Sequence, residues 1–487
     1  MKTLAALFLV PLFAAAAITP AEVDAVVTAA RALPPEFAAD ALIRVATIDT
    51  IAKTRRVELL DEAFRKAVQA EQAYRLRSAM MAAPAPVAFL SKVNQQDLDA
   101  LDLQARAASA MLPLDASRAR KLVQSIAPPK LSPRTCDDYM VYDLDGFYQV
   151  LGAAARSYSD AEKQSGDAVR FLRPYVAITS GVQVGPVAAV IADSGLNDGD
   201  FSSLINAFAA VLGKVQGDDR SFTASYMAGF RIQALVAECK RRKISPLTLL
   251  EAYRLYLVVN LSGPRCADND RMQGGMVMAA NAEAMAAQEA VDEAAFFNQK
   301  LRMEPLQPIQ EGESTPSRLE GAVTGLRTCL DEECGAVAQK LHGLILNGNG
   351  APVLPADRES KDWRNRHQEL LDQMAKWEAG PRTNAAEHFR EKVLLYNELL
   401  SISPAGEARD AVLHAELSYL IASHKDAANR TEWFLPLNGL LARTTLDPAG
   451  FAALRTEMLK SSDPIVALYA RLETLAPRPA DRLTLLL

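Results

Sequence analysis

The sequence predicts an all-α protein: an array of helical hairpins, either α-solenoid-like or divided into several bundles, with little or no β-sheet. Apolar residues recur at positions i, i+3, i+4 and i+7 through most segments, which is the spacing of one helix face. Alternating runs of β-branched residues, which would predict strands, are nearly absent. Hydrophobic residues make up 49% of the chain and charged residues 23%, values that exclude a disordered tail and a polytopic membrane protein.

Residues 1–17 are typical of a secretory signal peptide. Lys2 gives the start a positive charge, residues 4–13 form an apolar run, and residues 14–17 are all alanine. The apolar run is too short to span a bilayer, and no later segment has about 18 uninterrupted apolar residues. We therefore expect an exported protein, periplasmic or extracellular, with no transmembrane segment in the mature chain.

Proline-rich stretches divide the rest of the chain into three helical blocks. The first covers residues 18–128 and ends at the adjacent prolines Pro128 and Pro129, which cannot continue a helix. The central block covers residues 129–303. Residues 304–318, rich in Pro, Gln, Glu and Ser, have the composition of a linker, and residues 319–487 form the C-terminal block.

The first block opens with a helix-start signal. Thr19 is a capping residue, Pro20 takes the first helical position, and Glu22 stands where a capping box places it. Periodicity and breaks predict the helices of this block at Pro20–Leu33, Glu36–Ile48, Lys53–Tyr74, Gln96–Met111 and Ser117–Ile126.

The central block contains one segment with two interpretations. Residues 175–191 are rich in Val, Ile and Thr and contain Gly181 and Gly185, so they form either a β-hairpin or a helix, a break and a second helix starting at Pro186. We favour the helices. The other helices of this block are predicted at Leu144–Tyr158, Phe201–Leu212, Phe222–Lys243, Pro246–Leu261 and Met276–Leu301.

Two further features of the central block bear on structure and function. Residues 246–261 are apolar nearly all round, which predicts a central helix covered by its neighbours. Residues 193–200 resemble a calcium loop, but Ser194 and Leu196 fall where ligands are needed, so a loop with Asp200 capping the next helix is favoured. In the C-terminal block, Asn384 and Glu387 have the spacing of a capping box.

The cysteines fit an exported chain, but their odd number leaves at least one thiol free or paired between chains. A bond between Cys239 and Cys266 is disfavoured because a simple helical hairpin would hold them roughly 20 Å apart. A helix break near Asp331 would let Cys329 and Cys334 form a disulfide, and without it both thiols are free. The full set is Cys136, Cys239, Cys266, Cys329 and Cys334.

Every histidine and tryptophan of the chain falls in the C-terminal block. Histidine is the usual general base near neutral pH, so any histidine-based catalysis involves this block. The weak candidates for a catalytic site are His388 and His414 with the nearby carboxylates Glu391 and Glu416. A closed pocket that places both histidines within reach of a carboxylate would favour an enzyme, whereas scattered histidines on an open surface would favour a scaffold.

Several common chemistries lack their motifs. There is no His-Glu-x-x-His, no Gly-x-Ser-x-Gly and no phosphate-binding Gly-x4-Gly-Lys motif, so neither a metal nor a cofactor is expected. The net charge of −6 provides no field for nucleic acid. The basic run of residues 240–243 suits the C-terminal end of a helix dipole.

A long helical array without catalytic motifs usually presents an extended surface to another macromolecule. The sequence therefore favours an exported protein–protein interaction scaffold. The alternative is an enzyme of unfamiliar type that uses the histidines and carboxylates of the C-terminal block. A third option is a copper carrier built on Met272, Met276, Met278 and Met285, because soft thioether ligands favour soft ions.

Overall fold

The computed structural model describes residues 19–79, 85–225, 227–261, 332–381 and 383–480, together with Cys266 and Leu483. Helices dominate these ranges, and the only sheet in them has two strands, so the all-α prediction is confirmed. The predicted signal peptide, the helix at residues 276–301, the linker and the four methionines of the copper option lie outside the described residues.

The first block folds around a buried helix, α2. The helices are α1 (Pro20–Arg31), α2 (Pro35–Ala46), α3 (Lys53–Ala67), α4 (Ala85–Asn94), α5 (Ala100–Met111) and α6 (Ala116–Ser125). Thr19 and Glu22 form the predicted capping box of α1. Every residue of α2 from Glu36 to Ala46 is buried, because α2 packs against α1, α3, α5 and α23.

The third helix was predicted to reach Tyr74, but α3 ends at Ala67. The chain continues into strand β1 (Leu76–Ser78), which pairs antiparallel with β2 (Met140–Tyr142) so that Leu76 lies opposite Tyr142. The guanidinium of Arg75 forms ion pairs with Asp97, Asp102 and Asp143. These contacts hold the extended backbone before β1. They join residues that are far apart in the sequence, so the periodicity of apolar residues does not reveal them.

The central block contains α7 (Asp145–Arg156), α8 (Asp160–Gln164), α9 (Asp167–Leu172), η1 (Arg173–Val176), η2 (Gly181–Gln183), α10 (Val184–Ala192), α11 (Asp198–Leu212), α12 (Asp219–Ala224), α13 (Ala228–Arg241) and α14 (Leu247–Leu261). Residues 175–191 are helical with a break, as favoured, and the second helix starts at Val184. Asp200 was predicted to cap α11, but the capping residue is Asn197, three residues earlier. The Asn197 side chain accepts a hydrogen bond from the backbone amide of Asp200.

The prediction that residues 246–261 form a covered, central helix is wrong. The helix, α14, lies at one end of the array, where it packs mainly against α11. Its Leu247 and Leu255 are 42% and 43% exposed. Among the described residues, one side of α14 is therefore only partly covered, whereas its Leu249, Leu250 and Tyr253 are at most 2% exposed.

The C-terminal block contains α17 (Glu332–Ile345), η4 (Pro355–Glu359), α18 (Lys361–Lys376), α19 (Ala385–Ile402), α20 (Glu407–Ala422), α21 (Arg430–Leu446), α22 (Ala452–Leu459) and α23 (Pro464–Leu475). Asn384 and Glu387 form the predicted capping box at the start of α19. None of the helices in the described ranges is long and apolar enough to cross a membrane.

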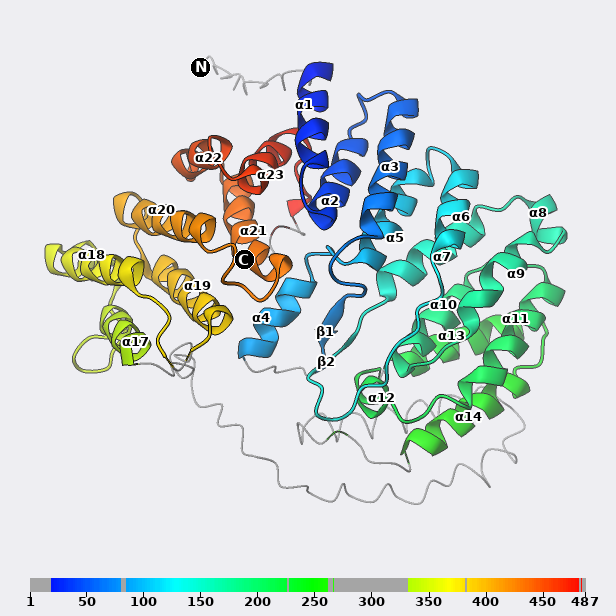
Figure 1. Cartoon of the computed structure of the whole chain (residues 1–487). Helices are drawn as coiled ribbons and strands as arrows, with labels where there is room; N and C mark the ends of the chain where they lie inside the picture. The colour runs from blue at the N-terminus through cyan, green and yellow to red at the C-terminus, as the bar shows by residue number, and fades with distance from the viewer. Residues whose placement is uncertain are drawn as a thin grey trace, which may run out of the picture.

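The helices form a curved array whose two ends are α14 and α17 (Figure 1). Successive neighbours in space run from α14 through α11, α10, α7 and α5 to α2, and then through α23, α21, α20 and α18 to α17. The first and last helices of the chain therefore meet in the middle of the array. Buried apolar side chains from all three blocks form one continuous core, and the division into three domains stays a prediction.

A disulfide joins Cys136, in the segment between α6 and β2, to Cys266, with the two Cα atoms 4.8 Å apart. No partner was predicted for Cys136 from the sequence. Cys239 is a buried free thiol, in keeping with the odd number of cysteines. Cys334 takes part in a disulfide, but Cys329 lies outside the described residues, so the pairing of these two stays a prediction.

Candidate functional site

The two candidate histidines lie in different surroundings. His388 is buried on α19, and its ring meets the ring of Trp377 edge-on at 4.6 Å between centroids. His414 lies on α20, where its side chain is 43% exposed and its Nδ1 contacts a carboxylate oxygen of Glu457. The structure thus places one histidine in the core and the other at the surface.

The two candidate carboxylates are both buried. Glu391 follows His388 by one helical turn on α19 and is 8% exposed. Glu416 is 1% exposed and faces the interior from α20, although His414 two residues earlier faces outward. Residues two apart on a helix point in different directions, so the candidates His414 and Glu416 do not face a common site.

Glu416 belongs to a row of ionisable side chains buried between α19 and α20. We call this set, Lys392, Tyr396, Glu416 and Tyr419, the α19–α20 row. The Lys392 ammonium donates a hydrogen bond to the backbone carbonyl of Trp377 at 2.7 Å and lies 4.6 Å from the centre of the Tyr419 ring. The rings of Tyr419 and Tyr396 have their centres 5.9 Å apart, and Glu416 influences Tyr396 electrostatically.

Burial perturbs the protonation of the row. It raises the pKa of Glu416 to about 8, with Arg443 of α21 opposing the shift. It also lowers the pKa of Lys392 to about 8, against the attraction of Glu333, Glu378 and Asp426. The pKa values of both tyrosines rise for the same reason. At neutral pH the row therefore holds a protonated carboxyl group and a readily deprotonated amine, groups suited to proton transfer.

The row is covered by protein in this conformation. Lys392, Tyr396 and Glu416 are 3%, 1% and 1% exposed. A general acid or base acts within hydrogen-bond reach of a substrate, and a substrate would have to displace helices to reach these atoms. The arrangement therefore stores protons inside the C-terminal block rather than presenting them to a ligand.

Two histidine–carboxylate pairs lie nearer the surface. Besides His414 with Glu457, the Nε2 of His424 lies 2.5 Å from an oxygen of Asp463, and its ring stacks on Trp433. Burial alone would raise the pKa of Asp463, but hydrogen bonds from His424 and from backbone amides of α23 lower it. Within the described ranges, no three His, Cys, Asp or Glu side chains come together in a way that would hold a metal ion.

The sequence singled out Glu416 but missed the residues around it. Lys392 and the two tyrosines carried no motif. Their only signal was position: on α19, Lys392 and Tyr396 are four residues apart, a spacing that places them on the same face as the apolar core residues. A charged residue in such a stripe is unusual enough to be considered for a buried role.

No family model, curated protein or solved structure matches this chain. The function therefore has to be argued from its own residues. Among these, the α19–α20 row combines a raised carboxyl pKa with a lowered amine pKa, whereas α13, its N-cap and α14 carry four of the eight exposed large hydrophobic residues in the described ranges.

The raised pKa of Glu416 predicts a pH dependence of stability. The folded protein holds the Glu416 proton up to about pH 8, whereas the unfolded chain releases it near pH 4.5. The contribution of Glu416 to the free energy of unfolding is fully present below pH 4.5. It falls by at most about 5 kcal/mol as the pH rises to 8. In Glu416→Gln, the free energy of unfolding measured in urea should fall less steeply between pH 4.5 and pH 8 than in the wild type. Glu407→Gln, at an exposed position of the same helix, is the control and should show the same pH dependence as the wild type. Equal slopes in both variants would contradict the raised pKa of Glu416.

Proposed function

We propose that the protein is an exported scaffold that binds another protein through its curved helical array. The observation that carries this proposal is that half of the exposed large apolar side chains in the described ranges lie on two successive helices, α13 with its N-cap and α14, toward one end of the array. Eight large hydrophobic residues among the described ranges are exposed, and four of them belong to α13, its N-cap and α14. These four, Met227, Phe230, Leu247 and Leu255, are called the α13–α14 patch.

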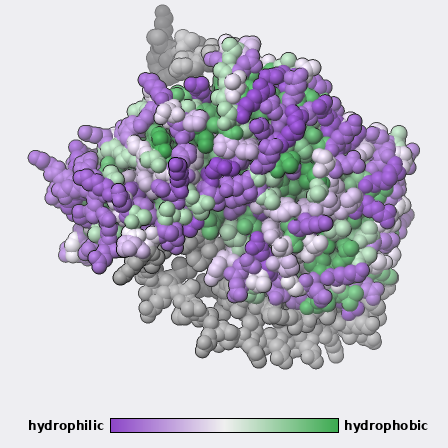
Figure 2. Space-filling view, viewed as in Figure 1, coloured by the Kyte–Doolittle hydropathy of each residue, from purple (hydrophilic) through white to green (hydrophobic). Residues whose placement is uncertain are grey.

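The patch is supported by the way its helices pack. One face of α13 is buried against α10, and one face of α14 is buried against α11. The opposite face of α13 carries Phe230 at 55% exposure, and Leu255, at the edge of the contact between α14 and the end of α11, is 43% exposed. Figure 2 shows hydrophobic surface gathered over this part of the molecule, whereas the α17–α18 end is mainly hydrophilic. Clustered exposed apolar side chains on a folded protein mark interaction sites.

Site-specific photo-crosslinking tests the scaffold proposal. A benzophenone amino acid placed at Phe230 or Leu255 of the tagged, exported protein should give one defined protein adduct, identified by mass spectrometry. The control position is Glu58 on α3, whose side chain is 67% exposed and remote from the patch. An adduct at both patch positions and none at Glu58 is expected.

A variant connects the adduct to the apolar surface. Phe230→Ser combined with Leu255→Ser truncates two side chains that are 55% and 43% exposed and lie outside the core, so the fold should persist, as checked by circular dichroism. Capture of the same partner should fall by about tenfold or more, since central aromatic contacts dominate binding energy. Unchanged capture, or the same adducts at all three positions, would overturn the assignment of the patch.

A second candidate function, an enzyme acting through acid–base chemistry, is favoured by the α19–α20 row. Its Glu416 is protonated at neutral pH and its Lys392 has a lowered pKa, as required of a proton donor and an acceptor. This candidate requires that the covering helices open. It predicts that a substrate would increase hydrogen exchange in α19 and α20, and that Glu416→Gln would abolish turnover while binding persists.

A further inference from the structure

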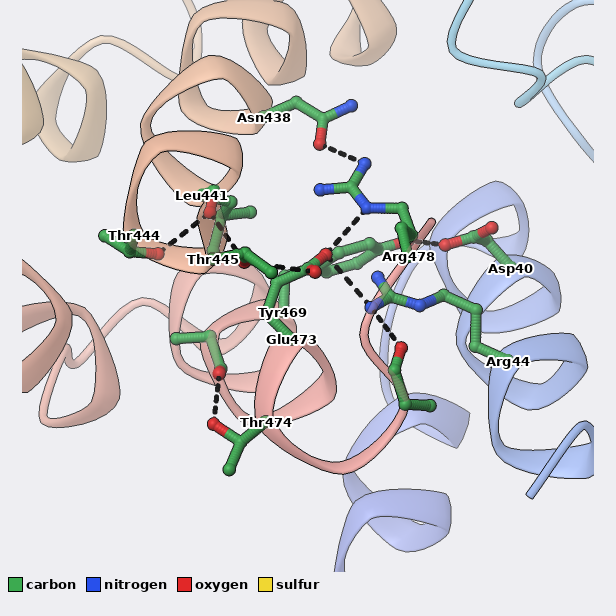
Figure 3. Close-up of polar contacts among 12 residues, drawn as sticks. Asp40, Arg44, Asn438, Leu441, Thr444, Thr445, Tyr469, Glu473, Thr474 and Arg478 are labelled. Atoms are coloured by element: carbon green, nitrogen blue, oxygen red, sulfur yellow. Dashed lines mark hydrogen bonds and ion pairs between the residues drawn. The ribbon is translucent and has the colours of Figure 1, made fainter. Parts of the chain in front are cut away.

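A buried polar cluster joins the two ends of the chain in the middle of the array (Figure 3). We call it the α2–α23 seam. It combines side chains from α2, α5, α21, α23 and the segment after α23, and its charged members are Asp40, Arg44, Arg106, Glu473 and Arg478. The seam is separate from the α13–α14 patch and from the α19–α20 row.

Two arginines of the seam share one carboxylate oxygen. The Oε1 atom of Glu473 forms an ion pair with Arg44 Nη2 at 2.9 Å and accepts a hydrogen bond from Arg478 Nε at 2.7 Å, so the two guanidinium groups lie beside each other. The other oxygen of Glu473 accepts from the hydroxyl of Thr445 at 3.2 Å. One carboxylate therefore serves two cations, and its second oxygen is already engaged.

The remaining donors of these arginines are only partly satisfied. Arg44 Nη2 also donates to the carbonyl of Ala476 at 2.8 Å, and Arg478 Nη1 donates to Asn438 at 2.5 Å. Arg44 Nε, Arg44 Nη1 and Arg478 Nη2 are buried and have no hydrogen-bond partner. Leaving a buried charged donor unsatisfied costs more than a typical hydrogen bond contributes, so three such nitrogens together require an acceptor.

The carboxylates are unevenly distributed among the arginines of the seam. Asp40 is occupied by Arg106 at 2.5 Å and by the hydroxyl of Tyr469 at 2.9 Å. Burial raises the pKa of Tyr469, which therefore stays neutral. Arg106 is attracted by both Asp40 and Asp97, whereas Arg44 and Arg478 form their ion pairs with the single carboxylate of Glu473. Burial, and to a smaller extent repulsion by Arg44, lowers the pKa of Arg478. The attraction of Glu473 and Asp40 opposes this shift.

We propose that Arg44 and Arg478 bind one small anion in the α2–α23 seam. The orphaned N–H groups supply the donors, and a single negative charge offsets the second of the two guanidinium groups that share Glu473. The side chain of Arg44 is 7% exposed and that of Arg478 is 20% exposed, so the approach is from the Arg478 side and is narrow. This enclosure favours an ion of the size of chloride, formate or phosphate over a larger ligand.

The location gives the anion a structural effect. Arg44 lies on α2, at the start of the chain, whereas Arg478 follows α23, at its end. An ion held by both reduces the repulsion between them and ties the first block to the last. Because it binds the folded seam only, it raises the unfolding midpoint in a saturable way. This inference does not depend on the proposed scaffold function.

Anion titrations of thermal unfolding test the proposal. The purified full chain is heated in sodium gluconate, a large anion, with chloride, formate or phosphate exchanged in at constant ionic strength. At least one small anion should raise the wild-type midpoint and reach a plateau, and the apparent affinity should weaken by about tenfold or more in Arg478→Gln. The matched control, Arg55→Gln on the surface of α3, should respond as the wild type does.

Bromide provides a readout that does not rely on a variant. Crystals of the wild type soaked in bromide should show an anomalous peak beside the guanidinium groups of Arg44 and Arg478. If Arg478→Gln does not fold, this peak decides the question alone. Equal anion responses in all three proteins, or no peak at the seam in soaked crystals, would overturn the proposal.

Discussion

Glu473→Gln is expected to lower the free energy of unfolding by about 3–5 kcal/mol. Glu473 is the carboxylate partner of both Arg44 and Arg478, and all three side chains are largely buried. Removing its charge leaves two neighbouring guanidinium groups without the carboxylate that contacts both, and breaking a buried ion pair is strongly destabilising. Urea unfolding followed by tryptophan fluorescence measures the effect, since Trp433 on α21 is buried near the seam.

Glu58→Gln is the matched control for this substitution. Glu58 contacts Arg55 at 3.4 Å, with its side chain 67% exposed, so its loss should change stability by no more than about 0.5 kcal/mol. If the two variants unfold at the same urea concentration, the seam does not stabilise the fold.

Replacing both Cys136 and Cys266 with alanine is expected to cost about 5 kcal/mol. The disulfide closes a loop with a sequence separation of 130, and the entropy that a cross-link removes from the unfolded chain grows with loop length. The measurement is the urea midpoint of the double variant against the oxidised wild type.

Cys239→Ala controls for the loss of a cysteine without the loss of a bond. Cys239 is a buried free thiol, so its replacement should have a smaller effect, about 1 kcal/mol, from lost packing. A double variant as stable as Cys239→Ala would show that the bond between Cys136 and Cys266 does not stabilise the protein.

The helices that were predicted accurately have local signals at their ends. The capping boxes at Thr19 and Asn384 use residues three apart, and both form as expected. Short-range hydrogen bonds of this kind depend only on neighbouring residues. The sequence alone therefore indicates where α1 and α19 begin.

The errors arise where distant residues decide the structure. The end of α3 depends on the pairing of Arg75 with Asp97, Asp102 and Asp143 across two blocks. The exposure of α14 depends on its place at the end of the array, which the pattern of its own residues does not encode. Periodicity reports which faces are apolar but not which neighbour covers them.

The same distinction applies to the sites. Glu416 was a candidate because it lies near His414, yet its unusual chemistry comes from burial beside Tyr396 of another helix. Arg44 and Glu473 lie at opposite ends of the chain and meet only in the folded protein. Neither association has a sequence motif, because each depends on the order of helices in space.

The contacts between α2 and α23, near the two ends of the chain, predict that these helices form one cooperative unit in the middle of the array. Hydrogen exchange with mass spectrometry on wild type and Glu473→Gln tests it most directly. We predict that amides of α2 and α23 exchange at similarly slow rates in the wild type, and that the substitution accelerates both together while α18 is little changed. Acceleration confined to α23, with α2 unaffected, would contradict the claim.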